Sequence, residues 1–364
     1  GPALAGGTDG RQRGHPVRLA VEPAGAALGG GRRQHAVGAG GHRGGAGADG
    51  GRVGRGGAGP GRRRGRGPDA GAALPAPAGR GGGAAGGARP AAGERADRTW
   101  PGGQLDGAAA APAAKPGKAE FLWLGQASFR IKTPGGKTIV IDPWITGGPK
   151  APAPYKTDLA ALGKVDLLLV THAHVDHIGD APALAKMHNT KLYGPADMVT
   201  PLITLGILPA DLGHRFNKSG SVKPLPGVKV TAVQAEHSSL LVWTNPATSK
   251  AESHPAGEAM GFIIELENGF KIWHMGDTGL FGDMKFISER YKPDLVLMPI
   301  GGNFTMDPED AAFAARTWIN PKMVIPMHYN SNPLTPGTLA EFQAAMKGSS
   351  ITVVPMTEGQ SVEF

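Results

Sequence analysis

Residues 119–364 of the sequence predict a mixed α/β domain with much antiparallel strand. Short apolar runs rich in β-branched residues alternate with Gly- and Pro-containing turns, which is typical of strands. Helix-like patterns lie between some of these runs, so an all-β fold is disfavoured. The segment holds roughly 245 residues, which is enough to bury a large core as one domain.

The first three apolar runs predict an antiparallel meander. They occupy residues 120–124, 128–131 and 138–142, and the turn at residues 134–136, Pro-Gly-Gly, joins the last two. No helical pattern separates them. We therefore expect a meander, and no strand–helix–strand unit, at the start of the domain.

Three segments have the pattern of helices. Residues 182–188 form the first and residues 338–347 the last. In the middle segment, residues 307–319, Asp307 stands where a helix N-cap is preferred and Pro308 at the first helical position. This pair marks the predicted start of that helix.

Four later apolar runs end close to a side chain that can bind a metal ion. Because a sheet holds the ends of its strands rigidly, the loops just beyond can bring distant side chains to one point. The sequence therefore predicts one site built from several strand ends. The pairs are the run 166–170 with His172, the run 228–235 with His237, the run 270–273 with Asp277, and the run 323–326 with His328.

The densest group of such side chains is the run 172–177, His-Ala-His-Val-Asp-His. Two histidines two positions apart on an extended segment point to one side, and the Asp and His that follow can turn toward a second ion. The alternative is a solvated polar loop. It is disfavoured because three imidazoles and a carboxylate directly after a Leu-Leu-Leu-Val strand need a cation to pair them.

The sequence contains no cysteine. This excludes disulfides and thiolate zinc sites, and it leaves imidazole and carboxylate as the strong metal ligands. Zn²⁺ suits such a ligand set, and Mn²⁺ or Fe²⁺ stays open for an oxygen-richer site.

The composition changes sharply before the predicted domain. Residues 1–118 contain 36 of the 59 glycines, and residues 1–114 lack Lys, Asn, Ile, Phe, Met, Tyr and Ser. Because so few large apolar side chains cannot offset the entropy of ordering the chain, we expect disorder in residues 1–118. One interpretation is GC-rich DNA translated outside its natural reading frame, since the missing residue types mostly have AT-rich codons. The other is an arginine–glycine tail that binds nucleic acid, which the run 61–66 favours.

The formal net charge of +8 does not describe the predicted domain. Residues 1–118 hold 18 of the 38 Lys and Arg residues and 7 of the 30 Asp and Glu residues, so residues 119–364 hold 20 basic and 23 acidic side chains, a net charge of −3. We therefore expect a small-molecule substrate, and no nucleic acid, for this domain. No apolar run is long enough to span a membrane, so we expect no membrane partner. The expected compartment is the cytoplasm, or the periplasm if the N-terminal segment conceals a signal peptide.

The run 172–177 resembles the His-x-His-x-Asp-His signature of the metallo-β-lactamase superfamily. The similarity extends over residues 119–364. His237 resembles the histidine of the third motif, Asp277 the bridging aspartate, and His328 the last histidine. The resemblance implies an αββα sandwich with the site at the edge between two sheets.

The resemblance also implies how seven ligands divide between two divalent ions, with Zn²⁺ expected first. Two such ions would lower the pKa of a shared water toward about 7, and the bridging hydroxide would attack a small ester-like substrate. One ion would be held by His172, His174 and His237, the other by Asp176, His177 and His328, and Asp277 would bridge both.

Asp176 is the candidate catalytic residue of this set. As a ligand that faces the water, it can orient the water and pass a proton to the leaving group. Asp142 follows a strand, and it either orients a ligating imidazole or is a turn residue before Pro143.

Within the superfamily, the runs 122–129, 141–144 and 299–306 resemble the metal-dependent hydrolase branch that includes ascorbate-6-phosphate lactonase. This implies a lactone or a phosphoester as the substrate. It leaves a homo-oligomer open, since members of the branch often form multimers. Gln126 departs from the branch, which often has His at that position, so the resemblance assigns it no role.

Other functions of the same fold compete with this one. An iron-dependent redox enzyme is disfavoured because no flavin domain accompanies the ligands. A β-lactamase-like amide hydrolase is disfavoured because resemblance in fold does not fix activity. The complete ligand set argues against a non-catalytic module.

Two further residues have open roles. His254 lies in a predicted loop at residues 252–257, and it is either a substrate contact or a surface histidine. Asn303 either donates a hydrogen bond to the substrate or caps a helix.

Overall fold

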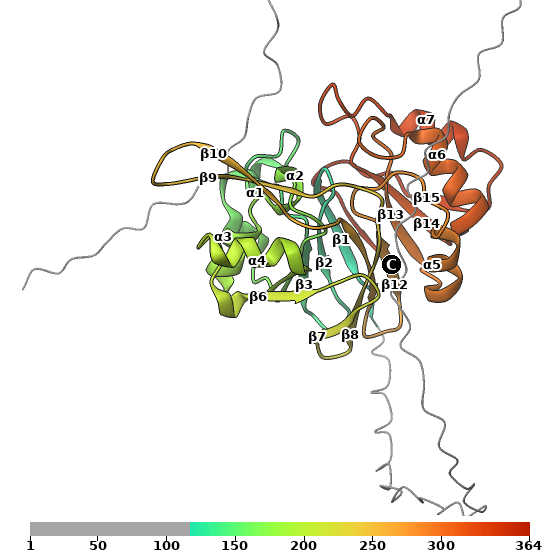
Figure 1. Ribbon diagram of the computed structural model, residues 1–364. Helices are drawn as coiled ribbons and strands as arrows, with labels where there is room; N and C mark the ends of the chain where they lie inside the picture. Colours follow the sequence, from blue (N-terminus) through green and yellow to red (C-terminus); the bar gives the residue numbers. More distant parts are fainter. Residues whose placement is uncertain (1–116) are drawn as a thin grey trace, which may run out of the picture. The chain divides into compact units, whose positions relative to one another are not determined.

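Two seven-stranded mixed sheets pack face to face in the computed structural model, which describes residues 117–364 (Figure 1). Helices cover the outer face of each sheet, so the layers run helix, sheet, sheet, helix. This arrangement confirms the predicted αββα fold class. The predictions made for residues 1–116 lie outside the described residues.

The first sheet begins with the predicted meander, in which β1 (Glu120–Gly125), β2 (Ser128–Lys132) and β3 (Thr138–Ile141) pair antiparallel. Because both faces of the sheet are covered, β1 and β3 are largely apolar, whereas β2 alternates the polar residues Ser128, Arg130 and Lys132 with Phe129 and Ile131. The sheet continues through the parallel strands β4 (Leu167–Leu169), β5 (Leu192–Pro195) and β6 (Gly213–Phe216), and β16 (Ser361–Glu363) pairs antiparallel with β1 at the other edge.

The second sheet repeats this plan with an antiparallel half and a parallel half. Its strands follow the order β15-β14-β13-β12-β11-β8-β7. The antiparallel half consists of β7 (Ser221–Leu225), β8 (Val228–Gln234), β11 (Met260–Glu265) and β12 (Lys271–His274). The parallel half continues from β12 through β13 (Leu295–Pro299), β14 (Met323–Met327) and β15 (Thr352–Val353).

Three apolar cores hold the layers together. Alternation along β1 places Phe121 in the core between the sheets and Leu122 in the core beneath the first helical layer. The third core lies between the second sheet and its helices.

The helices form two layers. The first helical layer contains α1 (Ala153–Thr157), α2 (Val175–Ile178), α3 (Ala181–His188), α4 (Ala196–Thr204) and the 3₁₀ turns Leu159–Leu162 and Ala210–Leu212. The second helical layer contains α5 (Met284–Tyr291), α6 (Pro308–Phe313) and α7 (Leu339–Ala345).

The helices predicted from the sequence are present with small changes at their ends. Asp307 is the N-cap of α6, and its side chain accepts a hydrogen bond from the Asp310 N–H. The predicted helix over residues 307–319 is divided, because the π-helix Ala314–Ile319 follows α6 directly.

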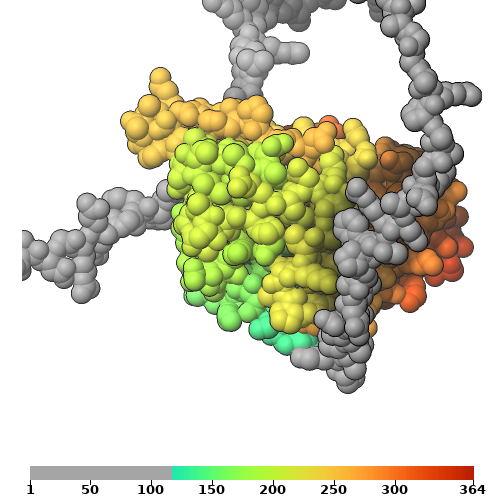
Figure 2. Space-filling model, turned by 60° about the horizontal axis from the view of Figure 1, so that its bottom comes forward, coloured from blue at the N-terminus to red at the C-terminus, as the bar shows by residue number. Residues whose placement is uncertain are grey.

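A two-stranded hairpin stands out from the first helical layer (Figures 1 and 2). It consists of β9 (Leu240–Thr244) and β10 (Ala251–Pro255). Leu241 and Trp243 are buried in the core beneath that layer, whereas the tip at residues 246–250 is exposed. The loop predicted at residues 252–257 is therefore wrong for its first part, which is strand.

Helix α7 offers a stability test away from the sheets. Thr338 forms a capping box in which its hydroxyl accepts from the Glu341 N–H at 3.2 Å and the Glu341 carboxylate accepts from the Thr338 N–H at 2.9 Å. We expect Thr338→Ala to lower the free energy of unfolding by about 1 kcal/mol, measured by urea denaturation. An unchanged midpoint would contradict this. Ser350→Ala, at an exposed position, is the control.

Candidate metal centre

The seven predicted ligands converge at one end of the two sheets. They lie on the loops that follow β4, β8, β12 and β14 and on α2, which begins directly after the first two histidines. Their ligand atoms form two compact groups, and within each group all of these atoms lie within 4.8 Å of one another. The groups are His172, His174 and His237, and Asp176, His177, Asp277 and His328.

The first group consists of imidazoles alone. His174 Nδ1 lies 3.0 Å from His172 Nε2 and 3.2 Å from His237 Nε2. Burial lowers the pKa of His172 well below its ordinary value, and burial also lowers the pKa of His174 and His237. The three rings are therefore neutral at pH 7, which is the form that binds metal.

The second group combines imidazole with carboxylate. His328 Nε2 lies 3.2 Å from Asp176 Oδ2 and 3.2 Å from Asp277 Oδ1. Asp277 Oδ2 lies 3.2 Å from His177 Nε2 and 3.6 Å from His237 Nε2, which belongs to the first group. Asp277 thus contacts ligands of both groups.

The carboxylates of the second group attract positive charge. Burial by itself would lower the pKa of His177, but the carboxylates around it, above all that of Asp277, outweigh burial and raise this pKa well above its ordinary value. Burial would likewise lower the pKa of His328, but the carboxylates of Asp277 and Asp176 outweigh burial and raise this pKa to about 9. Burial would raise the pKa of Asp176 and of Asp277, but the neighbouring histidines hold both pKa values below the ordinary range.

The donor atoms fit a divalent cation. His177 Nε2 and Asp277 Oδ1 are buried and make no hydrogen bond within residues 117–364. Buried polar atoms in folded proteins almost always have a partner, and a cation between these atoms supplies one to both. Imidazole and carboxylate in these numbers are the ligand set of zinc sites, with Mn²⁺ or Fe²⁺ as alternatives.

Asp142 fixes one of the ligands. It is fully buried, and its Oδ2 accepts from His177 Nδ1 at 2.8 Å and from the Thr171 hydroxyl at 2.7 Å. Its Oδ1 accepts from the Thr171 N–H at 2.7 Å. Because Nδ1 donates to Asp142, the ring directs Nε2 toward the cluster, where a bound metal ion would replace the Nε2 proton. Of the two interpretations of Asp142, these contacts favour orientation of an imidazole.

Three residues at the site have left-handed backbone conformations, which are uncommon outside glycine. The φ angles are 50° at Gln126, 45° at Asp142 and 55° at His328. Each residue directly follows a strand, so the chain turns sharply where the strand ends. Such a conformation costs about 1–3 kcal/mol and persists where surrounding contacts enforce it. One such contact is the hydrogen bond from the His328 N–H to the Gln126 carbonyl, at 3.1 Å.

Gln126 contacts the ligands directly. Its Nε2 donates to Asp176 Oδ2 at 2.9 Å and lies 2.9 Å from His328 Nε2. The sequence left the role of this side chain open, because its partners lie 50 and 202 positions away. Thr171 was likewise not identified as a partner of Asp142. No local sequence signal marks either contact.

His254 and Asn303 lie outside the ligand cluster. His254 belongs to β10, and its Nε2 lies 3.4 Å from Glu252 Oε2. Asn303 is exposed on the loop after β13 and has φ of 58°. It does not cap α6, because Asp307 does.

Two mixed sheets flanked by helices, with a histidine- and aspartate-rich cluster at strand ends, define the metallo-β-lactamase fold class. A model of the β-lactamase superfamily domain matches residues 137–329. The chain belongs to the β-lactamase superfamily and, within it, to the UPF0173 metal-dependent hydrolases.

Close relatives support this assignment. The chain is 79% identical over 259 residues to a UPF0173 metal-dependent hydrolase of Polynucleobacter asymbioticus, a match that covers 71% of this chain and 91% of the relative. A relative from a Polaromonas species is 61% identical over 248 residues, which cover 68% of this chain and 90% of the relative. The chain is therefore a metal-dependent hydrolase, as the resemblance implied.

Solved structures agree with the fold. Igni18, a metallo hydrolase of Ignicoccus hospitalis, matches with a TM-score of 0.57 and 32% identity over 68% of this chain and 98% of that chain. An isothiocyanate hydrolase from Delia radicum gut bacteria matches with a TM-score of 0.52 and 18% identity over 67% of this chain and 98% of that chain, and it shows the fold alone. In residues 117–364, no helix combines the length and apolar character that a membrane span requires.

Proposed function

We propose that the domain hydrolyses a small ester-like bond, in a lactone or a phosphoester, with two divalent metal ions, Zn²⁺ first among them. The observation that supports this is the division of seven donor side chains into two groups that share Asp277. When bound, the ions supply a lowered pKa for a coordinated water and positive charge for the substrate oxygen.

The protein's own side chains orient the reacting groups. Asp176 is the most exposed ligand of the second group, with 24% of its side chain accessible, so solvent and substrate can reach it. The Gln126 amide N–H holds one oxygen of this carboxylate in place. We assign Asp176 to orient the attacking water and to carry its proton to the leaving group.

The three histidines of the first group are uncharged and are held rigidly. The Ala173 N–H donates to Ser239 Oγ at 3.1 Å, and the Ser239 hydroxyl donates to the Ala256 carbonyl at 3.1 Å. These bonds tie the segment between His172 and His174 to the neighbouring loop. The histidines are therefore held in place by the fold before any ligand binds.

A substrate and metal screen tests the proposal. The Zn²⁺-loaded protein is assayed against simple lactones, phosphoesters and β-lactams, and the metal content is measured by mass spectrometry. We expect lactone or phosphoester hydrolysis with about two ions per chain, and a loss of at least roughly 100-fold in kcat/KM in both His174→Ala and Asp176→Asn. His174→Ala also removes one imidazole ligand, so its metal content should fall.

Three outcomes would contradict the proposal. Activity that survives both substitutions excludes the assigned site. Stoichiometric iron with oxygen consumption and no hydrolysis favours the redox alternative. Hydrolysis of β-lactams alone favours the amide hydrolase.

A further inference from the structure

The ligand histidines of the metal centre differ in what holds their rings. Within residues 117–364, the rings of His174 and His237 make hydrogen-bonding contacts only with other ligands. His174 is the N-cap residue of α2, so the helix fixes its backbone. His237 lies on the loop between β8 and β9 and has no such helix. The backbone of this loop must therefore place the His237 ring.

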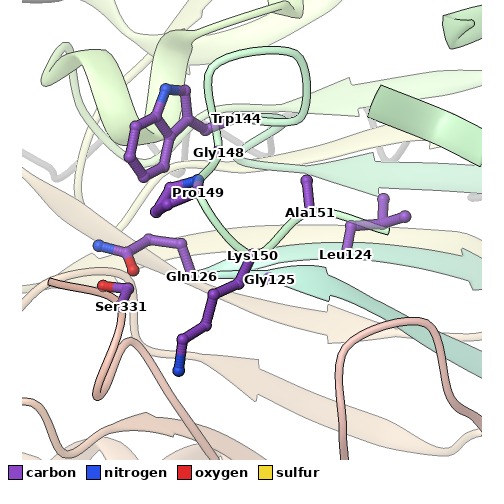
Figure 3. Close-up of a pocket in the computed structure, with 9 residues that line it drawn as sticks. All are labelled: Leu124, Gly125, Gln126, Trp144, Gly148, Pro149, Lys150, Ala151 and Ser331. Atoms are coloured by element: carbon purple, nitrogen blue, oxygen red, sulfur yellow. The ribbon is translucent and has the colours of Figure 1, made fainter. Parts of the chain in front are cut away.

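The second group has a support that His237 lacks. Gln126 Nε2 lies 2.9 Å from His328 Nε2, and the Gln126 side chain lies between those of Pro149 and Ser331 in Figure 3. Among the described residues, no side chain outside the ligand set makes a comparable contact with the His237 ring. His237 therefore depends on its loop more than His328 does.

The segment after Asp277 binds both backbone groups of Glu236, the residue before His237. The Glu236 N–H donates to the Thr278 hydroxyl at 2.9 Å, and the Gly279 N–H donates to the Glu236 carbonyl at 3.0 Å. The Thr278 hydroxyl donates its own proton to the Gly279 carbonyl at 2.8 Å, which leaves its oxygen free to accept from Glu236. The loop of His237 is thus held at a residue adjacent to the ligand.

This hydrogen bond fixes two ligands relative to each other. Thr278 directly follows Asp277, and Glu236 directly precedes His237. His237 Nε2 lies 3.6 Å from Asp277 Oδ2, and this contact joins the first group to the carboxylate that both groups share. A functional site holds its groups to within about 0.5 Å, so the fold must set this separation.

Thr278 is itself firmly anchored. Its side chain is buried, and its carbonyl accepts from the Met306 N–H at 2.9 Å. Met306 belongs to the third core, between the second sheet and its helices. A threonine that served only its own turn would bond to residues nearby in the chain, whereas Glu236 lies 42 positions from Thr278. The hydroxyl therefore joins two separate ligand loops.

We propose that Thr278 is a positioning residue for the metal position formed by the first group. Its hydroxyl holds His237 in place relative to Asp277 and thereby sets the affinity of that position for its ion. The proposal rests on the two-ion site of the proposed function. Thr278 acts through the backbone of Glu236, and the chemical step belongs to the ligands and the ions.

Thr278→Val and Thr278→Ser test the role of the hydroxyl. Valine keeps the shape of the side chain without the hydroxyl, and serine keeps the hydroxyl. Competition of the full chain with a chelator measures Zn²⁺ affinity in two binding steps. For Thr278→Val we expect one step to weaken by about 10–100-fold, the usual effect of losing a support of a ligand, and the other to stay within about twofold. Thr278→Ser should stay within about threefold of the wild type in both steps.

A double-mutant cycle with His237→Ala separates positioning from a general loss of stability. If Thr278 acts through His237, adding Thr278→Val to His237→Ala should weaken Zn²⁺ binding by less than about twofold. In an Asp176→Asn background, which alters the second group, Thr278→Val should keep its full effect. A purely structural role for Thr278 would give the same loss in every background.

Thr190→Val is the matched control. Thr190 is buried, and its hydroxyl donates to the Asp166 carbonyl at 2.9 Å, next to the end of β4 that lies opposite the ligands. Both Thr190→Val and Thr278→Val remove a hydroxyl that donates to a backbone carbonyl, so both should lower the urea midpoint of the metal-free protein. Only Thr278→Val should lose Zn²⁺ affinity.

Failure of this inference and failure of the proposed function give different results. If the wild type binds two ions and Thr278→Val keeps both affinities, or if Thr278→Ser loses as much as Thr278→Val, the inference is wrong and the hydrolase stands. If the wild type binds two ions but hydrolyses no lactone or phosphoester, and Thr278→Val still weakens one step, the inference stands alone. A wild type that binds fewer than two ions contradicts both. Should Thr278→Val not fold, Thr278→Ala takes its place in the same measurements.

Discussion

Asp277→Ala is expected to abolish hydrolysis, with a fall of at least about 1000-fold in kcat/KM, and to lower the metal content from about two ions per chain to one or fewer. Asp277 is the residue whose carboxylate contacts both ligand groups, at 3.2 Å from His177 and 3.6 Å from His237. Its removal therefore affects both metal positions, whereas loss of a histidine affects one. Steady-state kinetics and metal analysis of the same preparations measure the two effects.

The same substitution is expected to destabilise the metal-free protein. Without Asp277, the protonated rings of His177 and His328 lose the carboxylate that contributes most to their raised pKa values. Removal of one partner from a buried ion pair typically costs about 3–5 kcal/mol. Asp277→Asn preserves the shape but removes the same negative charge, so it should also destabilise the metal-free protein. If Asp277→Ala kept two ions and activity within tenfold of the wild type, the bridging role would be wrong.

Asp142→Asn should weaken metal binding by about 10–100-fold although Asp142 is not a ligand. The carboxylate accepts three hydrogen bonds, two from Thr171 and one from His177. An amide has one oxygen, and its NH₂ group opposes a donor, so at least one buried donor loses its partner. This should lower the free energy of unfolding by about 1–3 kcal/mol.

Competition with a chelator measures the affinity of Asp142→Asn, and urea denaturation measures its stability. Asp211→Asn, a substitution at an exposed position in the first helical layer, should change neither quantity. Unchanged metal affinity in Asp142→Asn, together with a normal fold, would show that Asp142 is a turn residue only. A drop in stability without a drop in affinity leads to the same conclusion.

Much of the fold could be predicted from the sequence because buried strands form short runs of apolar residues that can be recognised locally. The runs that became β1, β3, β4, β8 and β14 are mostly apolar, and β3 and β8 are also rich in β-branched residues. Asp307 and Thr338 cap α6 and α7, as their residue types favour. The order of strands within the two sheets has no such local signal. The family resemblance implied the αββα layers but no strand order, because pairings such as β1 with β16 join residues more than 200 positions apart.

Strand β10 is an element that the local sequence pattern does not predict. Its sequence, Ala-Glu-Ser-His-Pro, has little intrinsic preference for strand, and residues 252–257 were predicted as a loop. Pairing with β9, whose Leu241 and Trp243 are anchored in the core, imposes the strand on it. Tertiary contacts thus override composition in this hairpin.

The sequence predicted the metal ligands themselves better than the residues that hold those ligands in place. The ligands could be recognised because their residue types and spacing are restricted by coordination chemistry. Their supports could not, since a hydrogen-bonding residue such as Gln126 or Thr171 is defined only by what lies opposite it in space. Asp142 is intermediate: its position after a strand suggested a role, but the choice between two roles required the location of His177.

The pairing of β16 with β1 has a consequence for how the protein is made. Ala119 and Phe364 exchange two backbone hydrogen bonds, of 3.0 and 3.1 Å, so one edge of the first sheet joins the two ends of the described segment. During translation, β1 must wait for about the entire domain to be synthesised before this partner exists. Its unpaired edge is exposed meanwhile to other chains on the same messenger. We therefore expect this edge of the first sheet to stay unpaired until the last strand, β16, has been synthesised.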